Sequence, residues 1–350
     1  MRRSVVTVPV CCLVLILFAT PALACGGLVA PNGSVNLLRT ATLAAYQDGV
    51  EHYVTSFEFA GGGAEFGSII PLPGVPTSVK RGGSWTLQRL QEEVAPPAVA
   101  RNSLALGGTS FDSAAKVILE KEIDALDITI LEGGGDAVGE WAEENGFGLT
   151  PDAPEILDFY AERSPIFMAA RFDVGRARDL GQGVGDGTPI HLAIPTQNPW
   201  VPLRILGLGR EPNEIIEADV FLLTESTPTL LPAPGTPELG RGIELERSEP
   251  ASRDLLTDLR SDKGMKWLAR EGLHLSYLRI DARADEVVHD LAIDASGTGI
   301  PSRISAGLQA PASPTWPQTS QVPWGLWAGA VAMAAALLLF LARGASSEWN

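Results

Sequence analysis

The chain has 350 residues and carries 26 Lys or Arg against 42 Asp or Glu, which gives a formal net charge of −16. This acidic balance argues against nucleic acid as a partner, because binding to the phosphate backbone needs clustered positive charge. Hydrophobic residues make up 45% of the chain. This content and the length of the chain are sufficient for one large domain, or two coupled ones, to bury a core.

The N-terminal residues 1–24 have the organisation of a secretory signal peptide. Two arginines precede an apolar run from Val5 to Phe18, and the small residues Ala22-Leu23-Ala24 follow it. This order of charged, apolar and small-residue regions predicts export, with cleavage before Cys25.

Cys25 is the single cysteine predicted for the mature chain, because Cys11 and Cys12 leave with the signal peptide. An intrachain disulfide is therefore excluded. The stretch from Ala22 to Cys25 resembles a degenerate bacterial lipobox, in which the cysteine carries lipid that binds the membrane. Such boxes usually have leucine where this chain has Ala22. Cys25 is thus a lipidation candidate, which mass spectrometry of the mature N-terminus would test.

The first part of the exported region predicts a hairpin, a strand and a helix. The segment from Ser34 to Phe59 is broken at Asp48-Gly49, which indicates two strands joined by a turn with positive φ. Phe66 to Pro76 is an apolar strand whose prolines confine it to a sheet edge or a strand end. Ser84 is expected to cap a helix that Pro96-Pro97 stops.

Two strands and two helices are predicted next. Lys116 to Ile123 and Asp127 to Leu131 have the composition of strands, and three glycines end the second one. Asp136 is expected to cap a short helix, and a capping box from Asp152 to Glu155 to open another. Apolar residues at helical spacing should let both helices cover one sheet.

The rest of the exported region continues the same alternation. The expected strands of the second half are apolar segments that begin at Ile166, His191, Val201 and Ala218. Leu230 to Gly242 has the composition of a proline-rich linker, Arg253 to Arg270 is predicted to be helical, and Leu273 begins the last predicted strand.

These elements predict an α+β fold. The exterior is expected to be a strand-rich, largely antiparallel domain over residues 25–300, with a few short helices. It forms either one domain or two coupled halves near residues 25–115 and 116–300. A Pro/Ser-rich stalk follows at residues 301–323, then a transmembrane helix at 324–342 and a cytoplasmic tail at 343–350.

The transmembrane prediction depends on the stretch from Trp324 to Ala342, which has 19 residues without a charge. At roughly 1.5 Å per residue it is about 28 Å long, close to the thickness of the hydrocarbon core of a bilayer. Tryptophans mark its upstream edge and Arg343 follows it, which predicts a cytoplasmic C-terminus. The chain is therefore expected in the cell membrane as a single-pass protein, with most of its residues outside.

Four stretches of the sequence resemble a known family. They are Ala24 to Gly27; Phe66 to Pro76 with Trp85 to Leu87; DITILEGGGDAVGEWAEENGF through Ser164-Pro165; and PIHLAIPTQNPWVPLRILGL with Tyr277-Leu278 and Asp290-Leu291. In order and spacing they are similar to the bacterial envelope family catalogued as domain of unknown function 2330. The resemblance implies an envelope location and a shared architecture, and it supplies no catalytic residue.

No cofactor, metal or catalytic residue is predicted. The four histidines, His52, His191, His274 and His289, lack metal-ligand spacing, and each is expected to be an ordinary surface or half-buried residue. The glycine-rich run from Gly181 to Gly187 does not match a nucleotide fingerprint and opens no helix, which favours a loop.

Two groups of carboxylates could hold calcium or act as an acid and a base on a glycan, since both tasks need convergent carboxyl oxygens. Sequence spacing does not place two carboxylates at a defined separation, so solvated faces are the expected arrangement. The groups are Glu120, Glu122, Asp124 and Asp127, and Glu211, Glu214, Glu217 and Asp219.

The sequence therefore favours a membrane-anchored, non-catalytic binding or assembly module of the bacterial cell envelope. Its expected partners are the membrane, through the single C-terminal helix, and an envelope protein or wall polymer. The alternative is an envelope hydrolase that uses carboxylates on glycan or peptide substrates. Whether the chain is an enzyme stays open at this point, although no recognisable nucleophile or metal motif supports it.

Overall fold

The computed structural model describes residues 27–29, 40–57, 67–94, 115–182, 188–237 and 239–311. The predicted signal peptide, the lipidation candidate Cys25, the predicted transmembrane helix and the cytoplasmic tail lie outside these ranges, as does the stalk beyond residue 311. Over the part of the chain that is described, helices fall short of the length and apolarity needed to cross a membrane.

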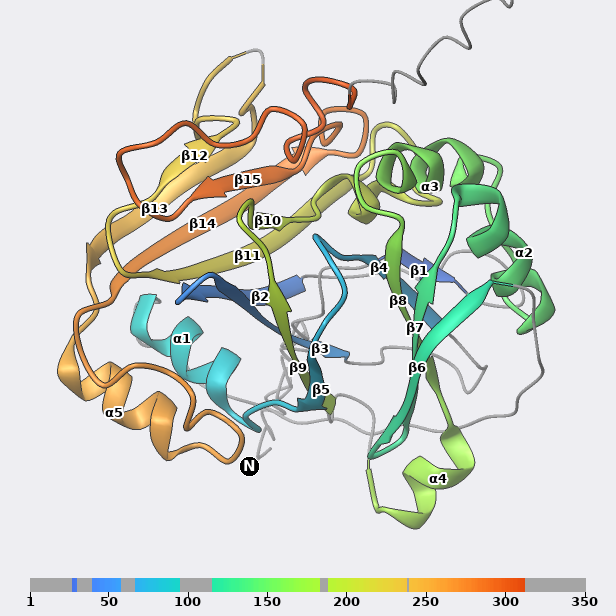
Figure 1. The fold of residues 1–350 in the computed structure, drawn as a ribbon, viewed down its shortest axis with the longest axis horizontal. Helices are drawn as coiled ribbons and strands as arrows, with labels where there is room; N and C mark the ends of the chain where they lie inside the picture. Colours follow the sequence, from blue (N-terminus) through green and yellow to red (C-terminus); the bar gives the residue numbers. More distant parts are fainter. Residues whose placement is uncertain are drawn as a thin grey trace, which may run out of the picture. The chain divides into compact units, whose positions relative to one another are not determined.

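The larger of the two main sheets has seven strands and is built around the predicted hairpin (Figure 1). Asp48 and Gly49 both have positive φ, at 52° and 77°, and they join two central strands by the two-residue turn that the sequence predicts. Among its pairs, β11 and β2 run parallel and the others antiparallel. Its strands in spatial order are β13 (Ile243–Pro250), β14 (His274–Arg283), β11 (Ile215–Thr224), β2 (Thr40–Gln47), β3 (Val50–Phe57), β9 (Thr188–Pro195) and β5 (Ser78–Arg81).

The second main sheet has five strands, and all of its pairs are antiparallel. The hairpin of β6 and β7 forms one side, and β6 is the edge strand. Pro71 is the last residue of β4, so the prediction of a strand end at these prolines is confirmed. The strands in spatial order are β1 (Gly27–Val29), β4 (Gly67–Pro71), β8 (Ile166–Phe172), β7 (Leu126–Glu132) and β6 (Lys116–Ile123).

The main hydrophobic core lies between the two sheets. Alternate residues of β7 and β8, such as Ile128 and Met168, meet Tyr53 and Leu192 of the larger sheet in one buried cluster. Because side chains alternate along a strand, the intervening residues point to the opposite face of each sheet. Each sheet therefore needs a second cover on its outer face.

Short helices supply that cover. α2 (Gly135–Glu144) and α3 (Ala153–Ala161) pack Val138 and Leu157 against Phe167 of the five-stranded sheet, as the sequence predicts. α1 (Thr86–Val94) and α5 (Arg253–Ser261) bury Leu90 and Leu256 against the outer face of the seven-stranded sheet. The described residues thus form a strand-rich α+β fold with mostly antiparallel sheets, which confirms the predicted class for this part of the chain.

A small third sheet is formed by segments that were not predicted to pair with one another. It comprises β10 (Trp200–Val201), β15 (Leu291–Asp294) and β12 (Thr229–Leu231), with a 3-10 helix, η1 (Arg204–Gly207), after β10. The apolar segment from Val201 is therefore mostly not a strand, and β14 is followed by β15 rather than being the last strand. Part of the predicted linker at 230–242 is the strand β12.

The side-chain caps predicted for α1, α2 and α3 are not made, and for α1 a tertiary contact takes the place of the local cap. α1 begins at Thr86 instead of following a Ser84 cap, and the Asp262 carboxylate accepts hydrogen bonds from the Ser84 and Trp85 amides at 3.0 and 2.9 Å. The N-cap of α2 is Gly134, with no side-chain cap. Asp152 is the N-cap residue of α3 but does not cap it through its side chain.

Two further segments are shorter than predicted or folded differently. α5 ends at Ser261, and the chain turns at Gly264, where φ is 99°, so the helix does not continue to Arg270. Residues 301–310, which the composition assigned to the stalk, belong to the same compact unit as the sheets. Ala306 is fully buried there, and its carbonyl accepts a hydrogen bond from the Asp290 amide at 3.2 Å.

Candidate functional site

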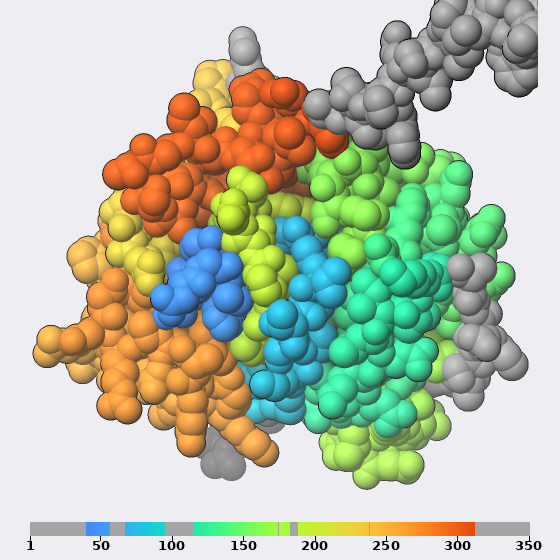
Figure 2. Space-filling model, viewed as in Figure 1, coloured from blue at the N-terminus to red at the C-terminus, as the bar shows by residue number. Residues whose placement is uncertain are grey.

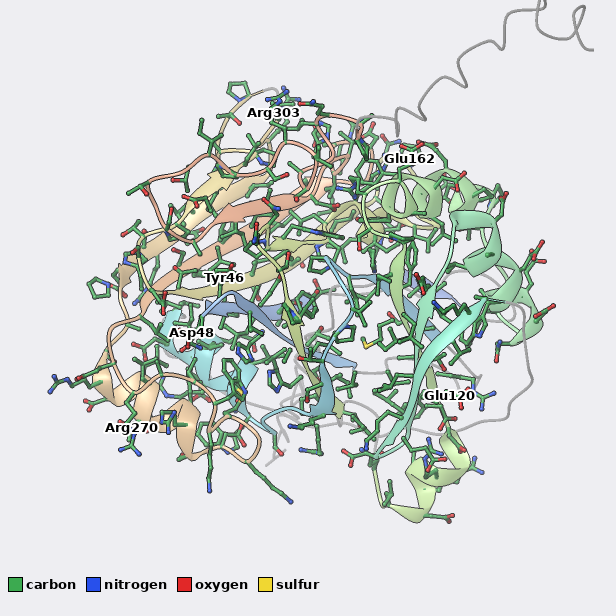
Figure 3. All side chains as sticks on the ribbon, in the orientation of Figure 1. Tyr46, Asp48, Glu120, Glu162, Arg270 and Arg303 are labelled. Carbon is green, nitrogen blue, oxygen red and sulfur yellow. The ribbon has the colours of Figure 1, made fainter. Side chains whose placement is uncertain are left out.

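A charged pocket of about 380 Å³ lies on the outer face of the five-stranded sheet, where α2 no longer covers it. Strand register places Glu122 opposite Asp127 and Asp127 opposite Arg171, so this row crosses three neighbouring strands. Residues opposite one another on paired strands share a face. The next row on that face begins at Glu120, which is labelled in Figure 3.

Two other elements complete the pocket. Trp141 and Asn145 at the end of α2 border one side. On the other side, α4 (Val174–Asp179) directly follows β8 and presents Arg176. The Asp173 carboxylate accepts a hydrogen bond from the Arg176 amide at 2.8 Å and so caps α4, which orients the first turn of the helix toward the sheet.

Asp127 lies between two arginines and organises the charges of the pocket. Its Oδ1 accepts from Nη2 of Arg176 at 2.6 Å, and its Oδ2 accepts from Nη2 of Arg171 at 3.1 Å. Arg176 also donates through Nε to the Asp124 carbonyl at 2.8 Å. Charge-assisted bonds of this kind are stronger than neutral ones and hold both guanidinium groups in defined positions.

Arg171 has one donor that the described residues leave unused. Its side chain is only 10% exposed, and Nη1 is buried without a hydrogen-bond partner among those residues. An unmet donor inside a protein is unfavourable by about 1–3 kcal/mol, and by more when it is charged. A group that accepts from Nη1 would therefore gain binding free energy.

The sequence-predicted carboxylates are divided between different places. Glu120, Glu122 and Asp127 line the pocket together, whereas Asp124 pairs with Arg81 at 2.6 Å. The lining holds four carboxylates and three cations, which leaves a formal balance of −1.

The second group of carboxylates does not converge. Asp219 is buried and accepts from the Tyr277 hydroxyl at 2.7 Å, while Glu214 pairs with Arg210 and Glu217 is exposed. In the described ranges, no three His, Cys, Asp or Glu side chains gather as a metal site would require.

Two histidines that were predicted to be separate, ordinary residues lie in contact. His52 Nδ1 and His191 Nε2 are 2.9 Å apart, although the residues are 139 positions apart in the chain. Trp267 stacks on both rings, with centroid distances of 4.0 and 4.8 Å. Burial lowers the pKa of His52 to about 4 and that of His191 to about 3. The pairing depends on β3 lying beside β9, and no spacing in the sequence signals it.

Asp290 is the centre of a second buried network. Its carboxylate accepts from the Tyr160 hydroxyl and from Nη2 of Arg163, both at 2.7 Å, and from the amides of Leu203 and Arg204. Arg163 and Asp290 side chains are 5% and 0% exposed. This network fastens α3 to η1 and to the segment before β15. Both carboxylate oxygens of Asp290 accept hydrogen bonds from the protein itself, so the network has a structural role.

The comparisons with known proteins identify a family and no activity. The model of the family described as "Uncharacterized protein conserved in bacteria (DUF2330)" matches residues 19–227. No curated protein matches the chain.

Three solved structures are similar at very low identity. The chain is 6% identical to a mutated baculovirus P35 after caspase cleavage, with a TM-score of 0.39, over 75% of this chain and 99% of that one. It is 7% identical to a chain of the caspase-8/P35 complex, with a TM-score of 0.37, over 73% and 95% of the two chains. For baculovirus P35 the values are 8%, 0.34, 61% and 75%. Scores of this size support no inference about the present chain.

Proposed function

Because the chain belongs to the DUF2330 family, whose description states no activity, we propose from its own residues that it is a binding or assembly module of the bacterial cell envelope. In this proposal residues 25–300 lie outside the cell, and the stretch 324–342 anchors them to the membrane. The signal-like N-terminus and the uncharged C-terminal stretch support this location.

The single observation that carries a binding function is the unused donor of Arg171 in the charged pocket. The guanidinium is held in place by Asp127, yet Nη1 has no acceptor among the described residues. An arginine at a pocket with one nitrogen left without an acceptor suits recognition of a carboxylate or another anionic group. The volume of about 380 Å³ suits a small ligand or one projecting group of a larger partner.

The hydrolase alternative has weaker support in this pocket. Acid–base cleavage of a glycan needs one carboxyl group that donates a proton and a second that activates water or attacks the sugar. Asp127 is engaged by two arginines, and Asp173 caps α4 and lies 3.7 Å from Arg176. Glu51, whose pKa burial raises to about 8, is fully buried and does not line the pocket.

The proposal is tested with the full-length protein in detergent. Thermal unfolding is measured with phosphate, short peptides and wall-type sugars, and the same compounds are assayed for hydrolysis. We expect at least one compound to raise Tm of the wild type and of Arg270→Gln, an exposed control, but not of Arg171→Gln. Hydrolysis that disappears in Asp127→Asn would establish the alternative, and a Tm unaffected by every compound would remove the pocket's role.

A further inference from the structure

The charges that line the pocket are separated in space. Arg171 lies on β8, two strands away from β6, where Glu120 and Glu122 are exposed. Neighbouring strands are roughly 4.8 Å apart, so the two sides are about 10 Å from one another at the level of the backbone. A ligand that spans the pocket from β8 to β6 therefore meets Arg171 at one end and Glu120 and Glu122 at the other, with Lys121 at the alternate position of β6 between these two glutamates.

The positive end suits a carboxylate. Asp127 occupies Nη2 of Arg171 and leaves Nη1, so the fork of the guanidinium is half used. A carboxylate has two oxygens in the geometry that this fork matches. Nη1 is itself buried, so the carboxylate assigned to it requires the guanidinium to rotate toward the pocket on binding.

The negative end suits an ammonium group. Glu120 is exposed and makes no ion pair with the other described residues, and Glu122 approaches Arg176 only at 3.8 Å. Both carboxylates lie on the edge strand, where a ligand can approach them from solvent. Figure 2 shows the segment that contains β6 at the surface of the face in view.

The balance of charge decides against ligands with one sign of charge. A phosphate or another multiply charged anion would meet four carboxylates in the lining, and a simple cation would meet Lys121 and two arginines. A ligand that carries both charges at opposite ends matches the pocket. An extended peptide spans at most about 3.3–3.6 Å per residue, so about three residues are needed to cover about 10 Å.

We propose that this pocket binds a short zwitterionic peptide, with its free carboxylate on Arg171 and its free ammonium on Glu120. This assignment rests on the proposed binding function and specifies its ligand class. The peptide backbone between the two charged ends would lie over Thr129, beside Asn145 and Trp141.

The test is calorimetric titration of the full-length protein in detergent with four probes. These are trialanine, N-acetyl-trialanine, trialanine amide and inorganic phosphate. Trialanine is expected to bind at least tenfold more tightly than either blocked peptide, because each blocked form lacks one charge. Glu120→Gln should weaken trialanine binding about tenfold and leave N-acetyl-trialanine unchanged, whereas the exposed Glu217→Gln on β11 should behave as wild type.

Arg171→Lys keeps the charge but lacks the fork, and it should weaken trialanine and its N-acetyl form equally, with Tm confirming that the variant is folded. Equal binding of the free and blocked peptides overturns the ligand class. Binding of phosphate that depends on Arg171, without peptide binding, also overturns it but leaves the binding function standing. If trialanine does not bind and no compound in the wider thermal panel does, both proposals fall.

Discussion

Glu51 allows the sharpest test of how the core is built. The residue is the second of β3, is fully buried, and lies opposite Ile194 in the strand pair with β9. Its Oε2 accepts from the Trp200 amide at 3.3 Å, and its Oε1 has no partner among the described residues. Burial raises its pKa from 4.5 to about 8, so the folded protein holds this carboxyl group neutral at pH 7.

The substitution Glu51→Gln removes this titration while keeping an acceptor for Trp200. The folded pKa lies above the unfolded one, so the stability due to the neutral group is complete below pH 4.5 and is lost as pH rises toward 8. At about 1.4 kcal/mol per pKa unit, the loss at pH 7 is roughly 3 kcal/mol as an upper limit. Glu51→Gln should therefore stabilise the protein by about 1–3 kcal/mol at pH 7 and have little effect near pH 4.5.

The assay is urea unfolding of both proteins in detergent at pH 4.5, 6 and 7.5, followed by tryptophan fluorescence. The difference in free energy of unfolding should grow steadily over this range, and Glu217→Gln, which alters an exposed carboxylate, should show no such growth. A Glu51→Gln variant that is equally stable, or equally unstable, relative to wild type at all three pH values would refute the assignment of a neutral buried carboxyl group.

Three further predictions concern other parts of the chain. The pKa values of His52 and His191 are below the usual 6.5, so the free energy of unfolding should fall as pH drops below 6.5. Measured by urea unfolding between pH 7.5 and 5, wild type should lose roughly 2 kcal/mol more than His191→Gln. Equal losses would contradict the pairing. Asp290→Ala strands the buried charge of Arg163 and should cost about 3–5 kcal/mol by the same method, whereas a cost below 1 kcal/mol would show that the network is dispensable. Deletion of residues 324–350 should release the protein from membranes washed with alkaline carbonate, and retention of the truncated chain would place the anchor elsewhere.

Much of the local structure follows from the sequence because its causes are local. The β2–β3 hairpin depends on Asp48-Gly49, a pair that favours the positive φ values of a two-residue turn. The β6–β7 hairpin and the two helices after it were likewise predicted within a few residues, since apolar spacing and glycines decide them. Predictions are wrong where a residue distant in the sequence makes the deciding contact. At the start of α1, for example, the Ser84 amide donates to Asp262, which is 178 positions further along the chain.

The candidate site divides in the same way. The sequence shows which residues carry charge, and it identifies Glu120, Glu122 and Asp127 as a group that could act together. It does not show that Asp127 faces Arg171, because that contact depends on the register between β7 and β8.

By itself, the sequence determined the family, the strand-rich class and most of the elements, since hydrophobic period and turn residues act over a few positions. Only the tertiary structure decided which charges meet. Strand pairing brings Arg171 to Asp127 in one sheet and His52 to His191 in the other, and the end of α2 leaves the sheet face at Arg171 and Asp127 uncovered. A shift of one residue in register would move each of these side chains to the other face, so the pocket exists only at the level of the whole fold.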